Sequence, residues 1–193
     1  MKKRIVFVLF GVIGIIGVSL LLFLTFWLGS HSVKQIISGT FEVSQPADIR
    51  HATEMTNKYF SMQYPGNWRI DTTDPDYDPD KYFDINAPAQ GKVFVYIFAP
   101  HAIPQQAVDT IVESTRKVVA NRKESRFESW GPHKGYGIQL QGLVVAMNTR
   151  VRVFGLGNSQ ATVVIVEMRY DKDEVNNKNG YDLIAQTFKF KDL

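Results

Sequence analysis

The chain has 193 residues, of which 22 are Lys or Arg and 19 are Asp or Glu, with a formal net charge of +3 and no Cys. The absence of cysteine excludes disulfides, thiolate chemistry and metal binding through sulfur. Lys2, Lys3 and Arg4 account for the whole basic excess, since the rest of the chain carries 19 basic and 19 acidic residues. The charge therefore gives no support for nucleic-acid binding, and no nucleic-acid partner is expected.

The chain opens with a long apolar run at residues 5–28, which contains no charged residue. As a helix, this run would span roughly 36 Å, enough to cross about 30 Å of bilayer hydrocarbon. Lys2, Lys3 and Arg4 stand directly before it, so the positive-inside rule places residues 1–4 in the cytoplasm. We therefore predict a single-pass signal anchor in the cell membrane, with the following chain on the outer side.

A cleaved signal peptide is the alternative interpretation of this run. Such peptides have an apolar region of about 7–15 residues that ends in a small-residue cleavage site. Residues 26–30 read FWLGS and match such a site poorly. A lipoprotein is excluded because there is no cysteine to acylate. The missing disulfides and glycosylation sequons favour a bacterial inner or cytoplasmic membrane.

Residues 29–52 are weakly patterned and are predicted to form a juxtamembrane stalk, with a short strand at residues 40–43. Gly39 and Pro46 would interrupt any longer helix. The folded extracytoplasmic domain is predicted to comprise residues 53–193, which is long enough to bury a core of its own.

The first half of this domain is predicted to form strands. Residues 59–64 alternate large apolar and polar side chains, as in a half-buried strand. A turn at residues 65–67 separates them from a short strand at 68–70, and further strands follow at 82–85 and 93–98. The last of these is almost continuously apolar, which is typical of a central strand.

The second half is predicted to form a helix, four strands and a second helix. Pro104 opens a helix expected to reach about residue 121, with an apolar stripe at three- and four-residue steps. Strands are expected at 125–130, 136–145, 149–154 and 161–170, with turns at 131–132, 147–148 and 155–159. A last helix is expected at 180–187. Short links between alternating strands favour hairpins, so the predicted class is α+β, with helices packed on a mostly antiparallel sheet of six or seven strands.

Several of these segments resemble one known superfamily. Residues 60–70 read FSMQYPGNWRI, which resembles the F-S-I-x-Y-P-x-x-W opening of PsbP-like and Mog1-like α/β/α sandwich domains. Residues 135–138 resemble the middle hairpin of those domains, and residues 187–190 resemble their closing S-F-K-F. The resemblance covers about residues 59–190 and implies an α/β/α sandwich. It also implies a mostly non-catalytic role, because many members are extrinsic, assembly or anchored bacterial proteins of unknown function.

The most unusual local sequence is the acidic loop at residues 71–80, DTTDPDYDPD. Asp74, Asp76, Asp78 and Asp80 alternate along it, so four carboxylates could converge on Ca²⁺, which prefers hard oxygen ligands. The loop lacks the glycine and the final glutamate of an EF-hand. The alternative is a solvated loop in which Asp and Pro form turns.

A second candidate is an aromatic binding surface, for which the sequence offers Trp68, Tyr77, Tyr82 and Tyr96. Core packing is the competing use of these side chains. No histidine stands at metal-binding spacing, and Gly155-x-Gly157 links two strands rather than a strand and a helix. Glu167 and Arg169 are expected to pair with Arg150 or Arg152 across neighbouring strands as structural contacts.

From the sequence we therefore expect a membrane-anchored extracytoplasmic binding or assembly module. No catalytic residues and no cofactor are predicted, and the expected partners are the membrane, through residues 5–28, and another envelope protein. The alternative is a calcium-dependent or other metal-dependent envelope enzyme, or a ligand-binding protein, that uses residues 71–80.

Overall fold

The computed structural model describes residues 44–98, 100 and 102–191. The chain divides into two units, Met1–Phe41 and Glu42–Leu193, and the described residues all belong to the second. The predicted anchor at 5–28, the strand at 40–43 and most of the predicted stalk thus lie outside the described residues. Within those residues, no helix is both long enough and apolar enough to cross a membrane.

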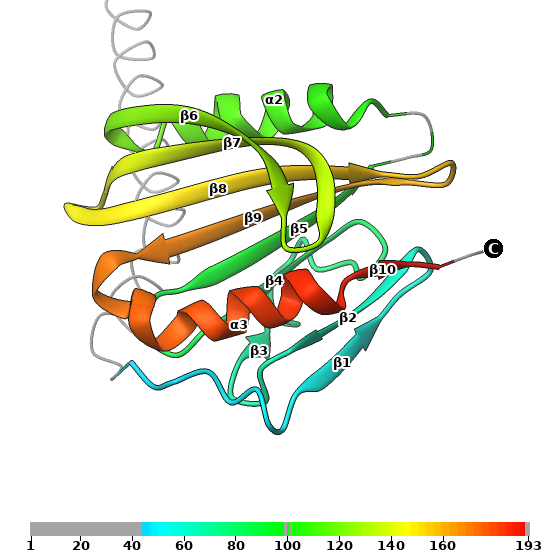
Figure 1. Cartoon of the computed structure of the whole chain (residues 1–193), viewed down its shortest axis with the longest axis horizontal. Helices are drawn as coiled ribbons and strands as arrows, with labels where there is room; N and C mark the ends of the chain where they lie inside the picture. The colour runs from blue at the N-terminus through cyan, green and yellow to red at the C-terminus, as the bar shows by residue number, and fades with distance from the viewer. Residues whose placement is uncertain (1–43, 99, 101, 192–193) are drawn as a thin grey trace, which may run out of the picture. The chain divides into compact units, whose positions relative to one another are not determined.

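Seven strands form the main sheet, in the order β3-β4-β5-β9-β8-β7-β6, and every neighbouring pair is antiparallel. The predicted α+β class, with a sheet of six or seven strands, is confirmed (Figure 1). The strands are β3 (Arg69–Ile70), β4 (Tyr82–Asn86), β5 (Lys92–Phe98), β6 (Ala120–Trp130), β7 (His133–Val144), β8 (Met147–Gly157) and β9 (Thr162–Tyr170).

A second, three-stranded sheet was not predicted. It consists of β1 (Thr53–Thr56), β2 (Phe60–Tyr64) and β10 (Lys189–Phe190), with β2 in the middle. Phe60 and Met62 point into the core, as the alternation in the sequence indicated. The sequence pattern cannot show which sheet a strand joins, because alternation reports only that one face is buried.

Two helices complete the layers, α2 (Pro104–Arg116) and α3 (Glu174–Thr187), with a 3-10 turn, η1 (Asp171–Asp173), before α3. Helix α2 ends five residues before the predicted residue 121, because Ala120 already belongs to β6. Helix α3 begins six residues before the predicted residue 180. Its first turns contain helix-unfavourable Asn and Gly, and the burial of Asn177 beside Gly91 and of Gly180 beside Trp68 overrides that propensity.

The helices lie on opposite faces of the main sheet (Figure 1), so the molecule has two cores. Helix α2 packs over β7, β8 and β9, while α3 packs on β9 and on β2. Strand β9 is buried on both faces, which explains its continuous apolar run at residues 163–166.

The chain from Ser44 onwards is hydrogen-bonded to the domain, although the sequence assigns it to the stalk. The Ala47 N–H donates to the Asn176 carbonyl at 2.9 Å, and the Gly66 N–H donates to the Asp48 carbonyl at 3.0 Å. The side-chain amide of Asn176 also donates to Ser44 Oγ at 3.0 Å. These bonds hold the segment beside α3 and the turn that follows β2.

The β7–β8 hairpin turns at Val145 and Ala146, so the turn predicted at 147–148 is wrong by two residues. Both residues have positive φ, 49° and 64°, as type I′ hairpin turns require. Such turns normally use Asn-Gly, because an L-residue with a Cβ is strained in this region. The long, regular ladder between β7 and β8 imposes this turn, although Val and Ala are unfavourable in it.

Replacing Val145 with Asn and Ala146 with Gly should therefore raise the free energy of unfolding by about 1–2 kcal/mol, by removing this strain. Urea denaturation of both proteins measures the change. Val175→Ala, at another exposed valine, serves as the control and should change stability by less than about 0.5 kcal/mol. A hairpin variant no more stable than the wild type would contradict the assigned turn geometry.

Candidate binding groove

The acidic loop uses its carboxylates to form its own turns. The Asp76 N–H donates to Asp74 Oδ1 at 2.8 Å, and the Asp80 N–H donates to Asp78 Oδ1 at 2.9 Å. These backbone hydrogen bonds, with a contact from Lys81, lower the pKa of Asp78. The turn-forming role that the sequence offered as an alternative is thus present in the structure.

The same loop covers the edge of β4 and joins the two sheets. Asp78 and Tyr82 exchange backbone hydrogen bonds of 2.8 and 2.7 Å. Asp80 Oδ1 accepts the N–H of Lys58, and the amide of Asn57 donates to the Pro79 carbonyl. Among the residues that the structure describes, no three His, Asp or Glu side chains form a group that could hold a metal ion. The calcium prediction requires the four aspartate carboxylates to converge on one point, and the described residues show no such group.

The predicted aromatic surface is divided by the fold. Trp68 is only 2% exposed and packs edge-on against Tyr181, with 5.2 Å between ring centroids. Tyr77 packs against the same core from outside. Tyr82 and Tyr96 alone come together, across β4 and β5, with 5.1 Å between ring centroids.

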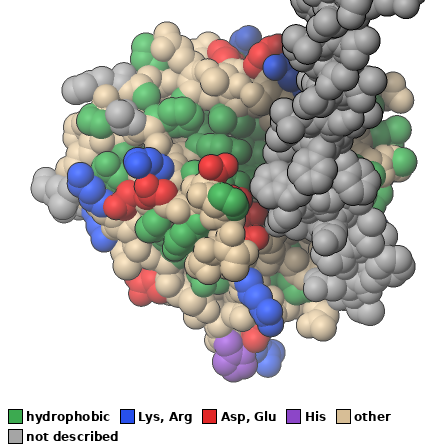
Figure 2. Space-filling view, turned by 180° about the vertical axis from the view of Figure 1, so that it is seen from behind, with side chains coloured by type: hydrophobic (Ala, Val, Ile, Leu, Met, Phe, Trp, Pro, Cys, Tyr) green, Lys and Arg blue, Asp and Glu red, His purple; other side chains and the backbone are tan. Residues whose placement is uncertain are grey.

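This tyrosine pair stands beside a buried carboxylate, Asp84, on the same face of β4. Burial raises the pKa of Asp84, although Lys92 Nζ lies 3.5 Å from its Oδ2. Burial also raises the pKa of both tyrosines, and the Asp84 charge adds to that effect. Figure 2, which shows the molecule from behind, shows acidic and basic side chains next to hydrophobic ones.

The strongest electrostatic feature is a buried ion-pair network on the opposite face. Glu167 is 1% exposed and accepts a hydrogen bond from Trp130 Nε1 at 2.7 Å. Its other oxygen lies 3.2 Å from Arg152 and 2.8 Å from Arg169. The cross-strand pairing expected for Glu167 and Arg152 is confirmed, whereas Arg150 lies 3.7 Å from Glu174 instead.

This network attaches α3 to the sheet. Arg169 contacts Glu174 at 3.1 Å and stacks on the Tyr181 ring, 4.3 Å from its centroid. Burial opposes the positive charge of Arg169, but Glu167 and Glu174 outweigh it and raise the pKa of the guanidinium. Because each charge already has a partner inside the fold, the arrangement is structural.

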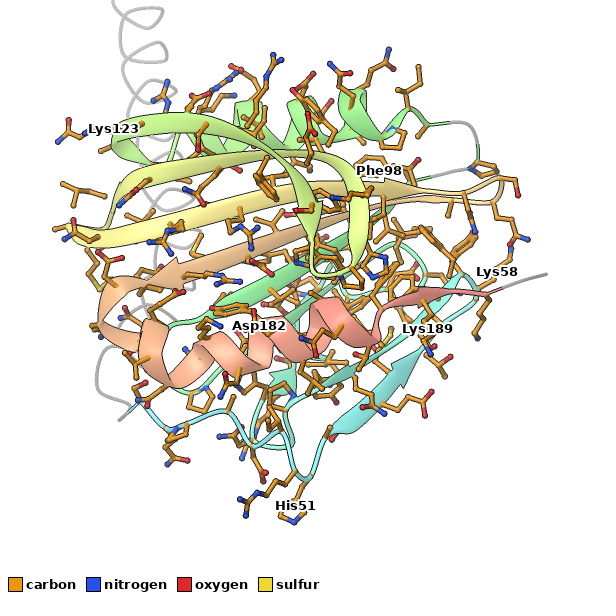
Figure 3. The ribbon with its side chains drawn as sticks, viewed as in Figure 1. His51, Lys58, Phe98, Lys123, Asp182 and Lys189 are labelled. Carbon is orange, nitrogen blue, oxygen red and sulfur yellow. The ribbon has the colours of Figure 1, made fainter. Side chains whose placement is uncertain are left out.

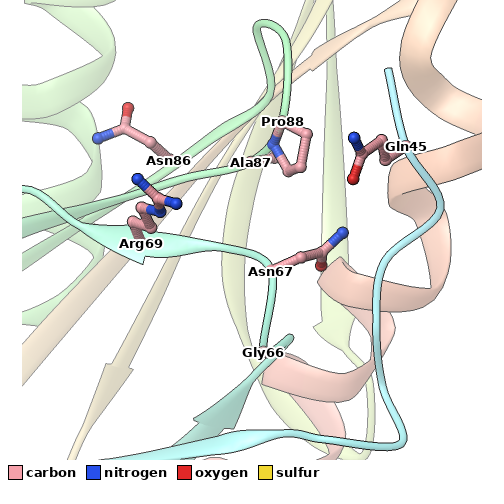
Figure 4. A pocket seen from close by; sticks show the side chains of 7 residues that line it. All are labelled: Gln45, Gly66, Asn67, Arg69, Asn86, Ala87 and Pro88. Atoms are coloured by element: carbon pink, nitrogen blue, oxygen red, sulfur yellow. The ribbon is translucent and has the colours of Figure 1, made fainter. Parts of the chain in front are cut away.

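The clearest open site is a groove of about 470 Å³ between the segment that begins at Ser44, the turn after β2, and the β4–β5 hairpin (Figure 4). Its lining is polar on one side and apolar on the other. The residues that line it are Gln45, Gly66, Asn67, Arg69, Asn86, Ala87 and Pro88.

Asn67 holds the groove together. Its Oδ1 accepts the Asp48 N–H at 2.9 Å, and its Nδ2 donates to the Pro46 carbonyl at 2.9 Å. Gly66 is required next to it, because a Cβ there would lie 2.2 Å from the carbonyl oxygen of His51. Asp48 Oδ2 lies 2.9 Å from Nδ1 of His51, which is labelled at the bottom of Figure 3.

Arg69 is the one charged residue of the groove lining. The residue is exposed, and within the described part of the chain its guanidinium has no ion pair or hydrogen bond. In contrast, Arg150, Arg152 and Arg169 all contact carboxylates. Sequence reasoning missed this residue because one arginine after a tryptophan carries no motif. The groove exists only once β3 pairs with β4 and residues 44–48 fold back.

No protein-family profile matches the chain, and no curated protein matches it. Similar solved structures include LpqN, involved in cell envelope biogenesis of Mycobacterium tuberculosis, at 11% identity and a TM-score of 0.46, covering 74% of this chain and 92% of that one. They also include the cyanobacterial PsbP of Synechocystis, at 10% identity and a TM-score of 0.48, covering 72% and 92%. A Pseudomonas aeruginosa protein of unknown function matches at 13% identity and a TM-score of 0.44, covering 74% and 99%. These similarities are of fold alone.

The structural role of Glu167 is testable. Glu167→Ala should lower the free energy of unfolding by about 3–5 kcal/mol, because the buried Arg169, the half-buried Arg152 and the Trp130 N–H lose this acceptor. Glu167→Gln should cost less, since an amide oxygen still accepts from the indole. Urea denaturation measures both. Glu128→Ala, on the exposed side of β6, is the matched control and should cost less than about 0.5 kcal/mol. Equal effects at positions 167 and 128 would refute the role assigned to the network.

Proposed function

We propose that the chain is a membrane-anchored, extracytoplasmic binding module whose ligand site is the groove at Arg69. The observation that carries this proposal is an open, preformed polar groove with an unpaired guanidinium. Ligand sites combine a concave shape with a few polar groups that have no partner within the protein. The other charged clusters have their partners within the fold.

The anchor is the second part of the proposal and rests on the apolar run at residues 5–28 with Lys2, Lys3 and Arg4 before it. An anchor of this kind would keep the groove near the outer surface of the membrane, where the partner is another envelope component. We propose a non-enzymatic role. Among the described residues that line the groove, Arg69 alone is ionisable, and it offers neither a nucleophile nor a general base.

The anchor predicts the behaviour of the full chain in bacterial cells. The full-length protein should sediment with the membranes after a carbonate wash, and its intact mass should include residues 1–28. Ile16→Arg should release it or block its insertion, because a charge at the centre of a membrane helix costs about 2.5–3.5 kcal/mol or more. Ile103→Arg, at an exposed position of the domain, should leave it in the membrane. A protein of lower mass in the soluble fraction would favour a cleaved signal peptide.

The groove predicts where ligands act on the folded domain. Small peptides and disaccharides added to the isotope-labelled full chain in detergent micelles should shift the NMR signals of Asn67, Arg69 and Asn86. Asn67→Ala should weaken these shifts, because it removes both hydrogen bonds that hold the segment from Ser44 in place.

Asn57→Ala is the matched control, since Asn57, between β1 and β2, makes a comparable set of bonds to Tyr59, Phe60 and Pro79, none of which lines the groove. It should leave the ligand-induced shifts at the groove unchanged. Shifts confined to other surfaces, or equal losses in both variants, would count against the groove as the site.

A further inference from the structure

The chemistry of the groove narrows the class of ligand. Arg69 supplies several N–H donors in a planar fork and one positive charge. It is directly paired with Asn86 across β3 and β4, so the guanidinium and a side-chain amide share one end of the groove. Among the residues that the structure describes, no acidic side chain lines the groove to compete for the guanidinium.

The donors available to a ligand are fewer than the lining suggests. Both polar atoms of the Asn67 side chain are bonded to the backbone of the segment from Ser44. Asn86 Nδ2 reaches Asp84 Oδ2 only at 3.5 Å, which is a long and weak contact. The ligand therefore meets one cation with the neutral amide of Asn86 beside it, and the amide of Gln45 lies across the groove. This set matches a single negative charge with two acceptor oxygens.

Ala87 and Pro88 form the apolar wall of the groove and follow directly after Asn86 in the chain. The wall offers contact to a small apolar group and no partner for a second charge. Ala87 is buried and its N–H already donates to the Gly91 carbonyl at 2.8 Å, so this wall is fixed by the β4–β5 hairpin.

We infer that the groove binds the C-terminal carboxylate of a short peptide whose last side chain is small and apolar, with Arg69 holding the carboxylate and Ala87 and Pro88 contacting the side chain. The inference rests on the proposed function and names the ligand class for the same groove. Asn86 acts as a second donor to the carboxylate, and Gln45 contacts the peptide backbone at the open end.

The probes are acetyl-Ala-Ala with a free carboxylate, the same dipeptide with a C-terminal amide, and inorganic phosphate. Each is titrated into the full chain in detergent micelles, and binding is followed by NMR at the groove signals. The free acid should bind about tenfold or more tightly than the amide, as a charge-assisted bidentate contact requires. Arg69→Gln should remove this preference, and Arg69→Lys should retain only part of it, because an ammonium lacks the planar fork.

Arg126→Gln, at an exposed arginine on β6, is the matched control and should keep the full preference. Equal binding of acid and amide at the groove would overturn the carboxylate assignment and leave the proposed binding function standing. Tighter binding of phosphate than of the free acid would overturn it in favour of a phosphate ligand. If none of the probes shifts the groove signals, the inference fails. The proposed function itself fails only if the disaccharides and longer peptides also leave those signals unchanged.

Discussion

The carboxylate of Glu167 is the contact on which the arrangement of layers depends. It lies in the centre of the main sheet and accepts hydrogen bonds from Trp130, Arg152 and Arg169, on three different strands. Arg169 then reaches Glu174 in the first turn of α3. A buried charge is costly unless its partners surround it, so these side chains have to assemble together. The helix is thereby held on one face of the sheet by a polar contact with a defined geometry, in addition to apolar packing around Tyr181.

The groove depends on this attachment. Asn176 of α3 accepts the backbone N–H of Ala47 and donates to Ser44, which brings the chain back along the domain. Asn67 then binds the same segment from the other side, and the groove forms between them and the β4–β5 hairpin. A change that moved α3 would therefore also move a wall of the groove, although no network residue lines it. Structural charges and the candidate binding site are connected through one helix and one short segment.

Much of the fold could be predicted from local patterns. Alternation identified the strands around Phe60, Val93 and Val151, and Pro104 marked the start of α2. The errors lie where distant contacts override local preference. Helix α3 extends through Asn177 and Gly180 because both are buried against loops of the domain, at Gly91 and Trp68. The β7–β8 turn occurs at residues with poor turn propensity because the strand ladder continues to Val144 and Met147. In the acidic loop, Asp74 and Asp78 each accept a backbone hydrogen bond from the residue two positions later, which local sequence predicts for Asp in turns.

The sequence by itself determined the α+β class and the antiparallel hairpins, because these follow from side-chain period and short links between strands, and it left Arg150 and Arg152 open as partners of Glu167 and Arg169. It also carries the prediction of an anchor at residues 5–28, which lies outside the described residues. Only the tertiary structure decided that β2 joins a separate sheet, that Trp68 belongs to the core, and that Arg69 faces an open groove. These features need residues far apart in the chain to meet, as Asp48 meets Asn67 and Trp130 meets Glu167, and no local pattern encodes such meetings.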